Sequence, residues 1–498
     1  MNVNPITRLD YPDPDVIRVE DTYYMVSTTM HFMPGCEILQ SFDLVHWEHA
    51  TYVYETLDHT DAQQLKSGQN IYGQGMWAAS LRYHEGRFYI CFVANDTRKT
   101  YLYTSEKIDG PWKKQLIEGF YHDGSLLFDE DGRNYIVYGN DEIWITELNE
   151  DLTAPKKDGL HRLLVSDHKN PELGYEGSHI QKINGYYYIF LIHSLRDRWM
   201  RTEACFYSDS LEGEFTGGDV LCDDRGYCGQ GVAQGGIVDT PDGKWYAMLF
   251  QDSGAVGRIP ILLPVTWKDH FPFFGQNGHV PEEIEVHSTR PGYIYQPLVG
   301  SDDFCNGLLP RWQFNHDPDP QYYHLDALQG TYTITTREVC TELTQAVNTL
   351  TQRMSYPSCA AEVTVDASAL KEGDVAGLCA LQSCYAAVGI TKHHGKYEVL
   401  MLDKKEDGIL DMTEGTVVES HQMDFRLEAD FCNMKDEARC YYRVNKGDWL
   451  PIGTVHKLYF KLDHFTGCRF GLFCYAAEET GGSACFRDFK YYDVDEIS

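Results

Sequence analysis

The 498-residue sequence has no long apolar run and few basic residues. No stretch reaches the roughly 18 consecutive apolar residues that a membrane-spanning helix needs, which excludes that class of protein. Lysine and arginine number 42 against 75 aspartate and glutamate residues, so the formal net charge is −33. Such a surface repels a phosphate backbone or an anionic membrane, so nucleic-acid and membrane partners are excluded, whereas a neutral sugar is compatible.

Metal-type cysteine pairs and a secretory segment are also missing. The 15 cysteines are scattered from Cys36 to Cys485 without a CxxC pair or a neighbouring pair of histidines, which excludes an ordinary zinc site. The stretch MNVNPITRLDYPDPD contains neither the basic nor the apolar segment of a signal peptide. We therefore expect a cytoplasmic protein whose free thiols act as small core residues. The sequence leaves the oligomeric state open.

Helical periodicity is nearly absent from the first 290 residues, and a strand-forming repeat takes its place. Five stretches share a turn residue followed by aromatics and a hydrophobic strand: EDTYYMVS, EGRFYICF, DGRNYIVYG, NGYYYIFLI and DGKWYAMLF. Their spacing of 46 to 65 residues suits four-stranded blades with loops of variable length. The repeat therefore predicts a five-bladed β-propeller over residues 1–295.

The composition changes near residue 300. The stretch RPGYIYQPLVGSDDF, residues 290–304, has the proline, glycine and acidic turn of a linker. Beyond it the aromatic repeat disappears, and alternating strands such as AAEVTVDA, AGLCALQ, YEVLML and RFGLFCYA are separated by polar turns. This pattern predicts a β-sandwich over residues 303–498, so the whole chain is expected to be all-β.

Three acidic residues stand at matching places in the repeat. Asp13, Asp123 and Glu176 lie 11, 12 and 12 residues before the repeat tyrosine of their blades, which predicts one depth around the propeller axis. Pro12 and Pro14 should hold Asp13 on a stiff, extended backbone. Converging carboxylates repel one another, so at least one should have a raised pKa. General acid–base catalysis needs such a protonated acid beside an ionised base.

Most of the first 290 residues resemble family 43 glycoside hydrolases, the propeller group of β-xylosidases and α-L-arabinofuranosidases. The matching stretches are YPDPDVIRVEDTYYMVSTT, MWAASLRYHEGRFYICF, HDGSLLFDEDGRNYIVYG, YEGSHIQKINGYYYIF, GQGVAQGGIVDTPDGKWYAML and GAVGRIPILLPVTW. The resemblance implies that Asp13 is the general base, that Asp123 orients the acid and tunes its pKa, and that Glu176 is the general acid. The family inverts anomeric configuration, which requires about 6.5–9.5 Å between base and acid.

The resemblance also implies residues that bind the substrate. Arg258, in GAVGRIP, would donate to a sugar hydroxyl and place a positive charge beside the carboxylates. Trp77, in MWAAS, would stack on the sugar ring, although inter-blade packing explains it nearly as well. The turn TTMHFMPG would form one wall of the pocket with Met30, His31 and Phe32.

Gln234, in VAQGGIV, occupies a place near the axis where many family members have a histidine that contacts a central calcium. An amide can hold a water or an ion but is not an imidazole ligand, so this position argues against a structural calcium. The resemblance implies no cofactor for the chemistry and no catalytic metal.

The second domain resembles the concanavalin-like (jelly-roll) sandwich that often follows these propellers. The residues that carry this resemblance are DDFCNGLLPRWQFNHDPDP, LTQRMSYPSCAAEVTVDASALKEGDVAGLCALQS and GGSACFRDFKYY. Such a domain is expected to buttress the propeller and to close the pocket with one loop. Whether it binds sugar by itself stays open.

The leading interpretation is an inverting, exo-acting glycoside hydrolase. It would release D-xylose or L-arabinose from the ends or branches of small xylo- and arabino-oligosaccharides. One alternative is a five-bladed furanosidase of the fructosidase type, which retains configuration and begins with an NDPNG-type motif that this sequence lacks. A second alternative is a non-catalytic carbohydrate-binding propeller, which the loss of a catalytic carboxylate would favour; all three carboxylates are present.

Overall fold

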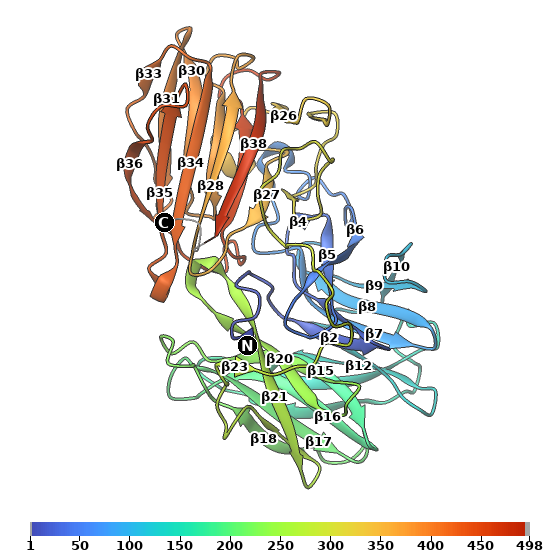
Figure 1. Ribbon diagram of the computed structural model, residues 1–498. Coiled ribbons are helices and arrows are strands. Elements are labelled where there is room, and N and C mark those ends of the chain that lie inside the picture. Colours follow the sequence, from blue (N-terminus) through green and yellow to red (C-terminus); the bar gives the residue numbers. More distant parts are fainter. Residues whose placement is uncertain (1, 494–498) are drawn as a thin grey trace.

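The computed structural model describes residues 2–493 and contains two β domains packed against each other (Figure 1). The propeller, coloured blue to yellow-green, lies below the sandwich, coloured orange to red. The predicted fold class is therefore confirmed, while residues 494–498 of the predicted second domain lie outside the described part. Within residues 2–493 no helix is long and apolar enough to cross a membrane. The helices there are short 3₁₀ turns: η1 (Lys66–Gly68), η2 (Gly254–Val256), η3 (Leu343–Gln345) and η4 (Cys432–Met434).

Five four-stranded antiparallel sheets form the propeller, each running outward from its first strand. Blade I is β2 (Asp15–Val19), β3 (Thr22–Val26), β5 (Gly35–Ser41) and β6 (Glu48–Tyr54). Blade II is β7 (Met76–His84), β8 (Arg87–Ala94), β9 (Lys99–Ser105) and β10 (Lys113–Ile117). Blade III is β11 (Ser125–Phe128), β12 (Asn134–Asn140), β13 (Glu142–Leu148) and β14 (His161–Ser166). Blade IV is β15 (Glu176–Ile183), β16 (Tyr186–Ser194), β17 (Arg201–Ser208) and β18 (Thr216–Leu221), and blade V is β19 (Ala233–Asp239), β20 (Trp245–Asp252), β21 (Arg258–Lys268) and β22 (Phe271–Phe274).

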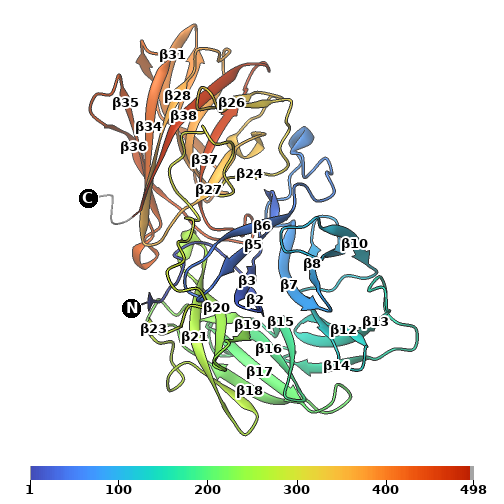
Figure 2. The same ribbon diagram turned by 45° about the vertical axis from the view of Figure 1, so that its right-hand side comes forward.

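The aromatic repeat marks the second strand of every blade, which confirms the predicted blade count. The repeat tyrosines lie in β3, β8, β12, β16 and β20: Tyr24, Tyr89, Tyr135, Tyr188 and Tyr246. The five inner strands neighbour one another in a closed ring in the order β2, β7, β11, β15, β19 (Figure 2). Residues that precede the inner strands therefore gather at one end of the axis.

The N-terminal segment docks on blade V. Strand β1 (Asn2–Val3) pairs with β23 (Glu283–Ile284). The Asn4 side chain exchanges two hydrogen bonds with the backbone of Leu262 in β21, at 2.7 and 3.1 Å. These contacts attach residues 2–4 to blade V and to the segment that follows it.

The C-terminal domain is a sandwich of two sheets. One sheet has the order β32-β31-β30-β29-β37-β27-β24-β4, with β33 also paired to β31, and the other has the order β25-β26-β38-β28-β34-β35-β36. Its strands are β24 (Gln313–Asn315), β25 (Tyr323–Asp326), β26 (Thr331–Thr335), β27 (Leu350–Arg353), β28 (Ser358–Asp366), β29 (Val375–Leu381), β30 (Ala386–His393), β31 (Lys396–Lys404), β32 (Leu410–Met412), β33 (Thr416–Val418), β34 (Gln422–Asp430), β35 (Glu437–Val444), β36 (Leu450–Lys457), β37 (Arg469–Tyr475) and β38 (Ser483–Asp493).

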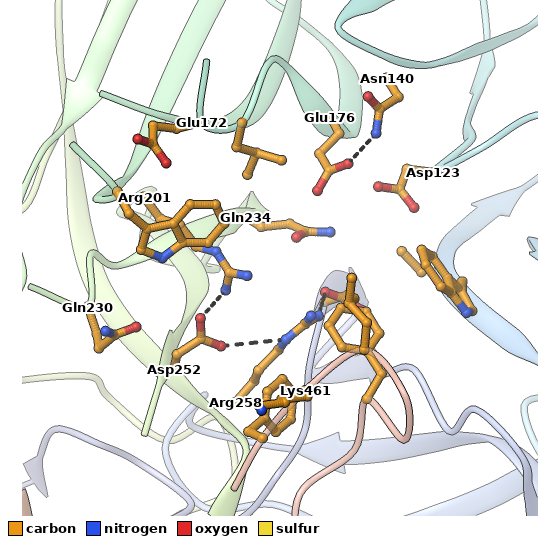
Figure 3. Close-up of a pocket in the computed structure, with 18 of the residues that line it drawn as sticks. Asp123, Asn140, Glu172, Glu176, Arg201, Gln230, Gln234, Asp252, Arg258 and Lys461 are labelled. Atoms are coloured by element: carbon orange, nitrogen blue, oxygen red, sulfur yellow. Dashed lines mark hydrogen bonds and ion pairs between the residues drawn. The ribbon is translucent and has the colours of Figure 1, made fainter. Parts of the chain in front are cut away.

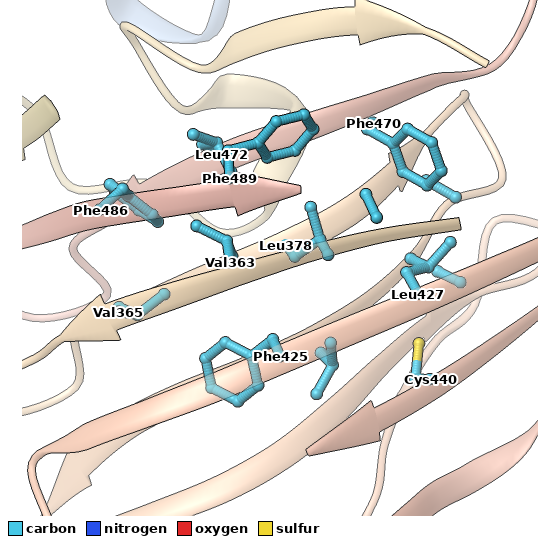
Figure 4. Close-up of a cluster of buried hydrophobic side chains, with 14 of the residues drawn as sticks. Val363, Val365, Leu378, Phe425, Leu427, Cys440, Phe470, Leu472, Phe486 and Phe489 are labelled. Atoms are coloured by element: carbon cyan, nitrogen blue, oxygen red, sulfur yellow. The ribbon is translucent and has the colours of Figure 1, made fainter. Parts of the chain in front are cut away.

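The main hydrophobic core of the sandwich lies between its two sheets (Figure 4). Leu378 and Leu472 of one sheet pack with Val363 and Phe425 of the other, and all four are at most 1% exposed. The core continues into the propeller through Ile259 of β21, so the two domains share one buried cluster. Ten of the 15 cysteines are buried, and all 15 are free thiols.

One propeller strand belongs to the sandwich. Strand β4 (Phe32–Met33), from a turn of blade I, pairs with β24 of the sandwich, with Phe314 opposite Met33 and Asn315 opposite Phe32. The predicted linker is also bound to the propeller rather than free: the backbone N–H of Phe42 in blade I donates to the Tyr295 hydroxyl at 2.9 Å. The two domains therefore share a β-sheet, and the linker between them is bound to the propeller.

Three buried histidines meet at the seam between the domains. His31 of blade I lies 4.8 Å from His316 and 5.0 Å from His464 between ring centroids, and Tyr72 stacks on His464 at 4.9 Å. Burial lowers the pKa of His31 and His316 well below the usual value and lowers the pKa of His464 to about 3. The Arg469 guanidinium also lowers the pKa of His464, while the Asp463 carboxylate opposes it. All three imidazoles are therefore neutral in the folded protein.

We expect this cluster to make the fold sensitive to acid. An unfolded histidine binds a proton near pH 6.5, so folding free energy is lost as pH falls below that value, by about 1.4 kcal/mol per pH unit for each histidine held neutral. Neither ring nitrogen of His464 has a hydrogen-bond partner among the described residues. His464→Phe should therefore have the wild-type free energy of unfolding at pH 7. Below pH 6 its free energy of unfolding should fall less steeply with pH, by about 1.4 kcal/mol per pH unit. Denaturant unfolding at pH 4.5–7.5 measures this, with the exposed His324→Phe as control; equal slopes in all three proteins would contradict it.

Candidate active site

Left-handed backbone at the entrance of the inner strands aims side chains into one cavity. Asp13 (φ 53°), Asp123 (φ 48°) and Gln234 (φ 63°) all adopt this conformation at or just before an inner strand. Such a conformation is uncommon outside glycine and persists only where the surroundings hold it. The expected extended backbone at Asp13 is therefore wrong: the Ser27 hydroxyl and the Thr28 N–H both donate to the Pro12 carbonyl and fix the turn.

The cavity has a volume of about 580 Å³ and is lined by both domains (Figure 3). The propeller contributes the predicted Asp13, Trp77, Asp123, Glu176, Gln234 and Arg258. It also contributes residues that were not singled out from the sequence, among them His122, Asn140, Glu172, Trp199, Arg201, Gln230 and Asp252. The sandwich contributes Met434, Phe460, Lys461, Leu462 and Phe465. Six of the nine predicted site residues therefore meet in one cavity.

Both oxygens of the Asp13 carboxylate have a close partner. Its Oδ1 lies 2.8 Å from Nη1 of Arg258, and its Oδ2 accepts a 2.6 Å hydrogen bond from the Thr28 hydroxyl. Both members of the ion pair are buried. The side chains of Asp13, Asp252 and Asp10 raise the pKa of Arg258 despite its burial. The pair places a carboxylate beside a guanidinium in a site largely shielded from water, a position where a general base can act.

Glu176 and Asp123 form a second group across the cavity (Figure 3). Oε2 of Glu176 accepts a 2.7 Å hydrogen bond from Nδ2 of Asn140, and Oδ2 of Asp123 accepts a 3.0 Å bond from the Gly177 N–H. Burial raises the pKa of Asp123 to about 6, with the Glu176 charge acting in the same direction and His122 against it. The expected raised pKa among the carboxylates therefore falls on Asp123.

A glycine makes room for this arrangement. Gly177, directly after Glu176, has φ +65°, and a Cβ there would lie 2.7 Å from Cγ of Gln234. The Gln234 side chain thus reaches the cavity between Glu176 and Arg258 (Figure 3), while its backbone N–H donates to Glu203 at 2.7 Å. Gly177 allows the close approach of neighbouring blades that brings the carboxylates together.

Asp252 joins two arginines on the far side of the cavity. Its carboxylate is ion-paired with Arg201 and lies 3.6 Å from Nε of Arg258. Trp199 packs over the Arg201 guanidinium at 5.4 Å and is 44% exposed, so it forms an accessible aromatic rim. This side of the cavity therefore offers an aromatic surface beside charged donors, features that suit a sugar ring and its hydroxyls.

A loop of the sandwich covers the catalytic side of the cavity. Phe465 packs over the Arg258 guanidinium at 4.1 Å and lies 5.5 Å from Trp77 between ring centroids. Phe460 lies on the same guanidinium at 5.6 Å. The second domain was expected to close the pocket with one loop; it lines the cavity with two segments, residues 460–465 and Met434 of η4.

The structure corrects the expected position of Met30, His31 and Phe32. These side chains are at most 1% exposed and do not belong to the described cavity lining. Their turn instead supplies β4, which enters the sandwich sheet, and His31 joins the histidine cluster at the seam. The pattern TTMHFMPG thus encodes the attachment of the second domain rather than a pocket wall.

Two groups of carboxylates and histidines have atoms close enough together to resemble a cation site. On the axis, the Asp15 carboxylate accepts bonds from Arg82 at 2.8 Å and His179 at 3.0 Å, and a guanidinium at that position does not fit the all-oxygen shell of calcium. In the cavity, single ligand atoms of His122, Asp123 and Glu176 lie within 4.8 Å of one another. The carboxylates raise the pKa of His122 to about 9, so a metal ion there would have to displace a proton from the imidazole.

The comparisons with known proteins agree with this geometry. Residues 3–272 match the model of glycosyl hydrolases family 43, and residues 301–492 match the β-xylosidase C-terminal concanavalin A-like domain. The chain belongs to glycosyl hydrolase family 43. It is therefore a glycoside hydrolase that acts on carbohydrate substrates, so the alternative of a non-catalytic propeller is wrong.

Similar proteins include enzymes and solved structures of this family. A β-xylosidase of Formosa agariphila is 26% identical over 99% of this chain and 89% of its own length. A non-reducing-end α-L-arabinofuranosidase of Bacteroides ovatus, BoGH43B, is 24% identical over 82% and 79% of the two chains. A bifunctional GH43-CE structure from Bacteroides eggerthii is 42% identical with a TM-score of 0.92, covering 100% of this chain. This chain spans 64% of the length of that bifunctional protein.

Several family-43 site residues of this chain carried little signal in the sequence. His122 directly precedes Asp123, and Asp252 precedes the GAVGRIP stretch, so proximity to a motif could have found both. Asn140 ends β12, where a position after a repeat strand gives no separate signal. The loop 460–465 is remote in sequence and reaches the cavity only through the packing of the two domains.

Gly467 allows that loop to approach, and a methyl group there should displace it. A Cβ at this position would lie 2.2 Å from the Val256 carbonyl oxygen and 2.7 Å from Cβ of Asp10. We expect Gly467→Ala to destabilise the fold by about 1–3 kcal/mol and to lower kcat/KM, because Phe465 moves off Arg258. Gly218→Ala, where nothing lies within 4 Å of the added carbon, is the matched control. Thermal unfolding and nitrophenyl-glycoside kinetics measure both; wild-type values for Gly467→Ala would contradict the role of the loop.

Proposed function

We propose that this family-43 hydrolase is an inverting exo-glycosidase that releases D-xylose or L-arabinose from the ends or branches of xylo- and arabino-oligosaccharides. The observation that carries the proposal is the division of the cavity between a paired carboxylate, Asp13, and a carboxyl group held beside a second acid, Glu176 with Asp123. Such a division separates the base from the acid, as glycoside hydrolysis requires.

In the proposed reaction Asp13 takes a proton from water, and the water oxygen attacks the anomeric carbon. The glycosidic C–O bond breaks on the opposite face, and its electron pair stays on the leaving oxygen. That oxygen receives the proton of Glu176, while Asn140 holds the carboxylate that forms. Arg258 positions Asp13 and offers its remaining N–H groups to a substrate hydroxyl. Solvent then returns the proton from Asp13 to Glu176, which balances the cycle.

The limited size of the cavity supports action on a chain end. Its volume of about 580 Å³ is that of a small-molecule pocket, and the loop 460–465 forms one wall. Trp77 and Phe465 flank the carboxylates, whereas Trp199 lies toward the rim beside Arg201. A terminal sugar would be enclosed near the carboxylates, and the leaving sugar would extend toward the rim. The names of the Formosa and Bacteroides relatives support xylose and arabinose as the enclosed sugar.

Substitution of the two carboxylates should separate their roles. Asp13→Asn removes the base, so turnover should fall by about 10²–10⁴-fold on every substrate. Glu176→Gln removes the proton donor, so xylobiose should lose far more activity than nitrophenyl xyloside, whose leaving group needs little protonation. Steady-state kinetics on both substrates measures this, and the exposed Asp109→Asn is the control. Equal losses on both substrates for Glu176→Gln would rule out its role as acid.

The product tests the reaction class directly. Nitrophenyl β-D-xyloside and nitrophenyl α-L-arabinofuranoside should be hydrolysed, whereas long insoluble xylan should release little sugar. Proton NMR during the first turnovers should show the anomer opposite to that of the substrate. The retained anomer would refute inversion and favour a covalent intermediate; no hydrolysis of either glycoside would refute the proposed substrates.

A further inference from the structure

His122 is a titratable side chain that the proposed reaction does not yet use. Its Nε2 lies 3.5 Å from Oδ2 of Asp123 and 3.6 Å from Oε2 of Glu176. The atom is buried and has no hydrogen-bond partner at conventional distance among the described residues. Nε2 therefore lies between the two carboxylates without a hydrogen bond to either. A small rotation of the side chain would bring it within hydrogen-bond distance of one of them.

The surroundings of His122 favour a positive charge. The ring borders Trp77 at 5.8 Å between centroids, and the charged groups that act on it are the carboxylates of Asp123, Glu176 and Asp13. The Arg258 guanidinium is occupied with Asp13 on the other side of the cavity. These carboxylates outweigh burial and raise the pKa of His122 to about 9.

The backbone of His122 is fixed beside Asn140. Its backbone carbonyl accepts a hydrogen bond from Gly139 at 3.0 Å, in the same blade as Asn140. His122 and Asp123, just before β11, and Asn140, at the end of β12, therefore present a cation, an anion and an amide to Glu176 from one side of blade III. The Glu176 carboxyl group, the proposed proton donor, thus has a positive neighbour in His122 and a negative neighbour in Asp123.

We propose that His122 is a positioning residue whose imidazolium opposes Asp123 and sets the acidity of Glu176. Asp123 favours the protonated acid that the reaction needs at its start, and His122 favours the carboxylate that remains after proton transfer. Between them the two charges set how readily Glu176 gives its proton to a sugar leaving group. This inference rests on the proposed role of Glu176 as general acid.

The two neighbours should shift the pH–rate profile in opposite directions. In His122→Gln the cation is lost, so the alkaline limb of kcat/KM should move up by about one pH unit, with a larger loss of kcat on xylobiose than on nitrophenyl xyloside. In Asp123→Asn the anion is lost, so the same limb should move down by about one unit. His122→Lys keeps a cation and should keep the wild-type limb. An unmoved or lowered limb in His122→Gln would overturn the proposal.

A readout without substrate separates this inference from the proposed function. NMR titration of ¹³C-labelled histidine, with the His122 signal assigned by its loss in His122→Gln, should show a pKa near 9 that falls by about one unit in Asp123→Asn. A pKa at or below 6.5 would overturn the proposal whatever the enzyme hydrolyses. Failure of every glycoside with a normal His122 titration would refute the substrates alone, whereas a protonated His122 with an unmoved limb would refute the positioning role.

Discussion

The buried carboxylate of Asp10 holds together the three parts of the chain that make the active site. Its Oδ1 accepts the backbone N–H of Arg258 at 2.8 Å, and its Oδ2 accepts that of Gly467 at 2.8 Å. Its carbonyl accepts a bond from Arg353 of the sandwich at 2.8 Å. Burial raises the pKa of Asp10, and the two backbone donors and nearby arginines offset much of that cost. One side chain thus fixes the base, its arginine and the covering loop to a common point.

This arrangement makes the second domain part of the active site. Asp13 follows Asp10 by three residues, Arg258 is bound through its backbone, and Phe465 precedes Gly467 by two residues. A Cβ at Gly257 would lie 2.3 Å from the Asp10 carboxylate, so the chain there must be glycine. The strand β4 and the shared core around Ile259 add to the same attachment. Separation of the domains would therefore uncover the carboxylates as well as the seam.

The sequence predicted much of this fold because propeller blades repeat in sequence as they repeat in space. The aromatic repeat placed the second strand of each blade, and the offsets of 11 or 12 residues at Asp13, Asp123 and Glu176 placed them at one end of the axis. Residues whose role depends on contact between distant segments could not be predicted in this way. The turn with His31 looked like a pocket wall because nothing local shows that it pairs with a strand almost 300 residues later. Phe465 was hidden for the same reason.

The sequence also could not assign the raised pKa to one particular carboxylate. Carboxylates gathered around an axis were expected to raise a pKa, and Asp123 has that raised value. The sequence could not show which carboxylate has the raised pKa, because the pKa depends on contact distances that differ by fractions of an ångström. Asp13 has an arginine at 2.8 Å and a hydroxyl at 2.6 Å, whereas Asp123 has one backbone N–H at 3.0 Å and an imidazole at 3.5 Å. Asp13 thus lies directly against a guanidinium, whereas burial and the Glu176 charge raise the pKa of Asp123 to about 6. The same residue type thus serves two parts of one reaction because the propeller gives each copy different neighbours.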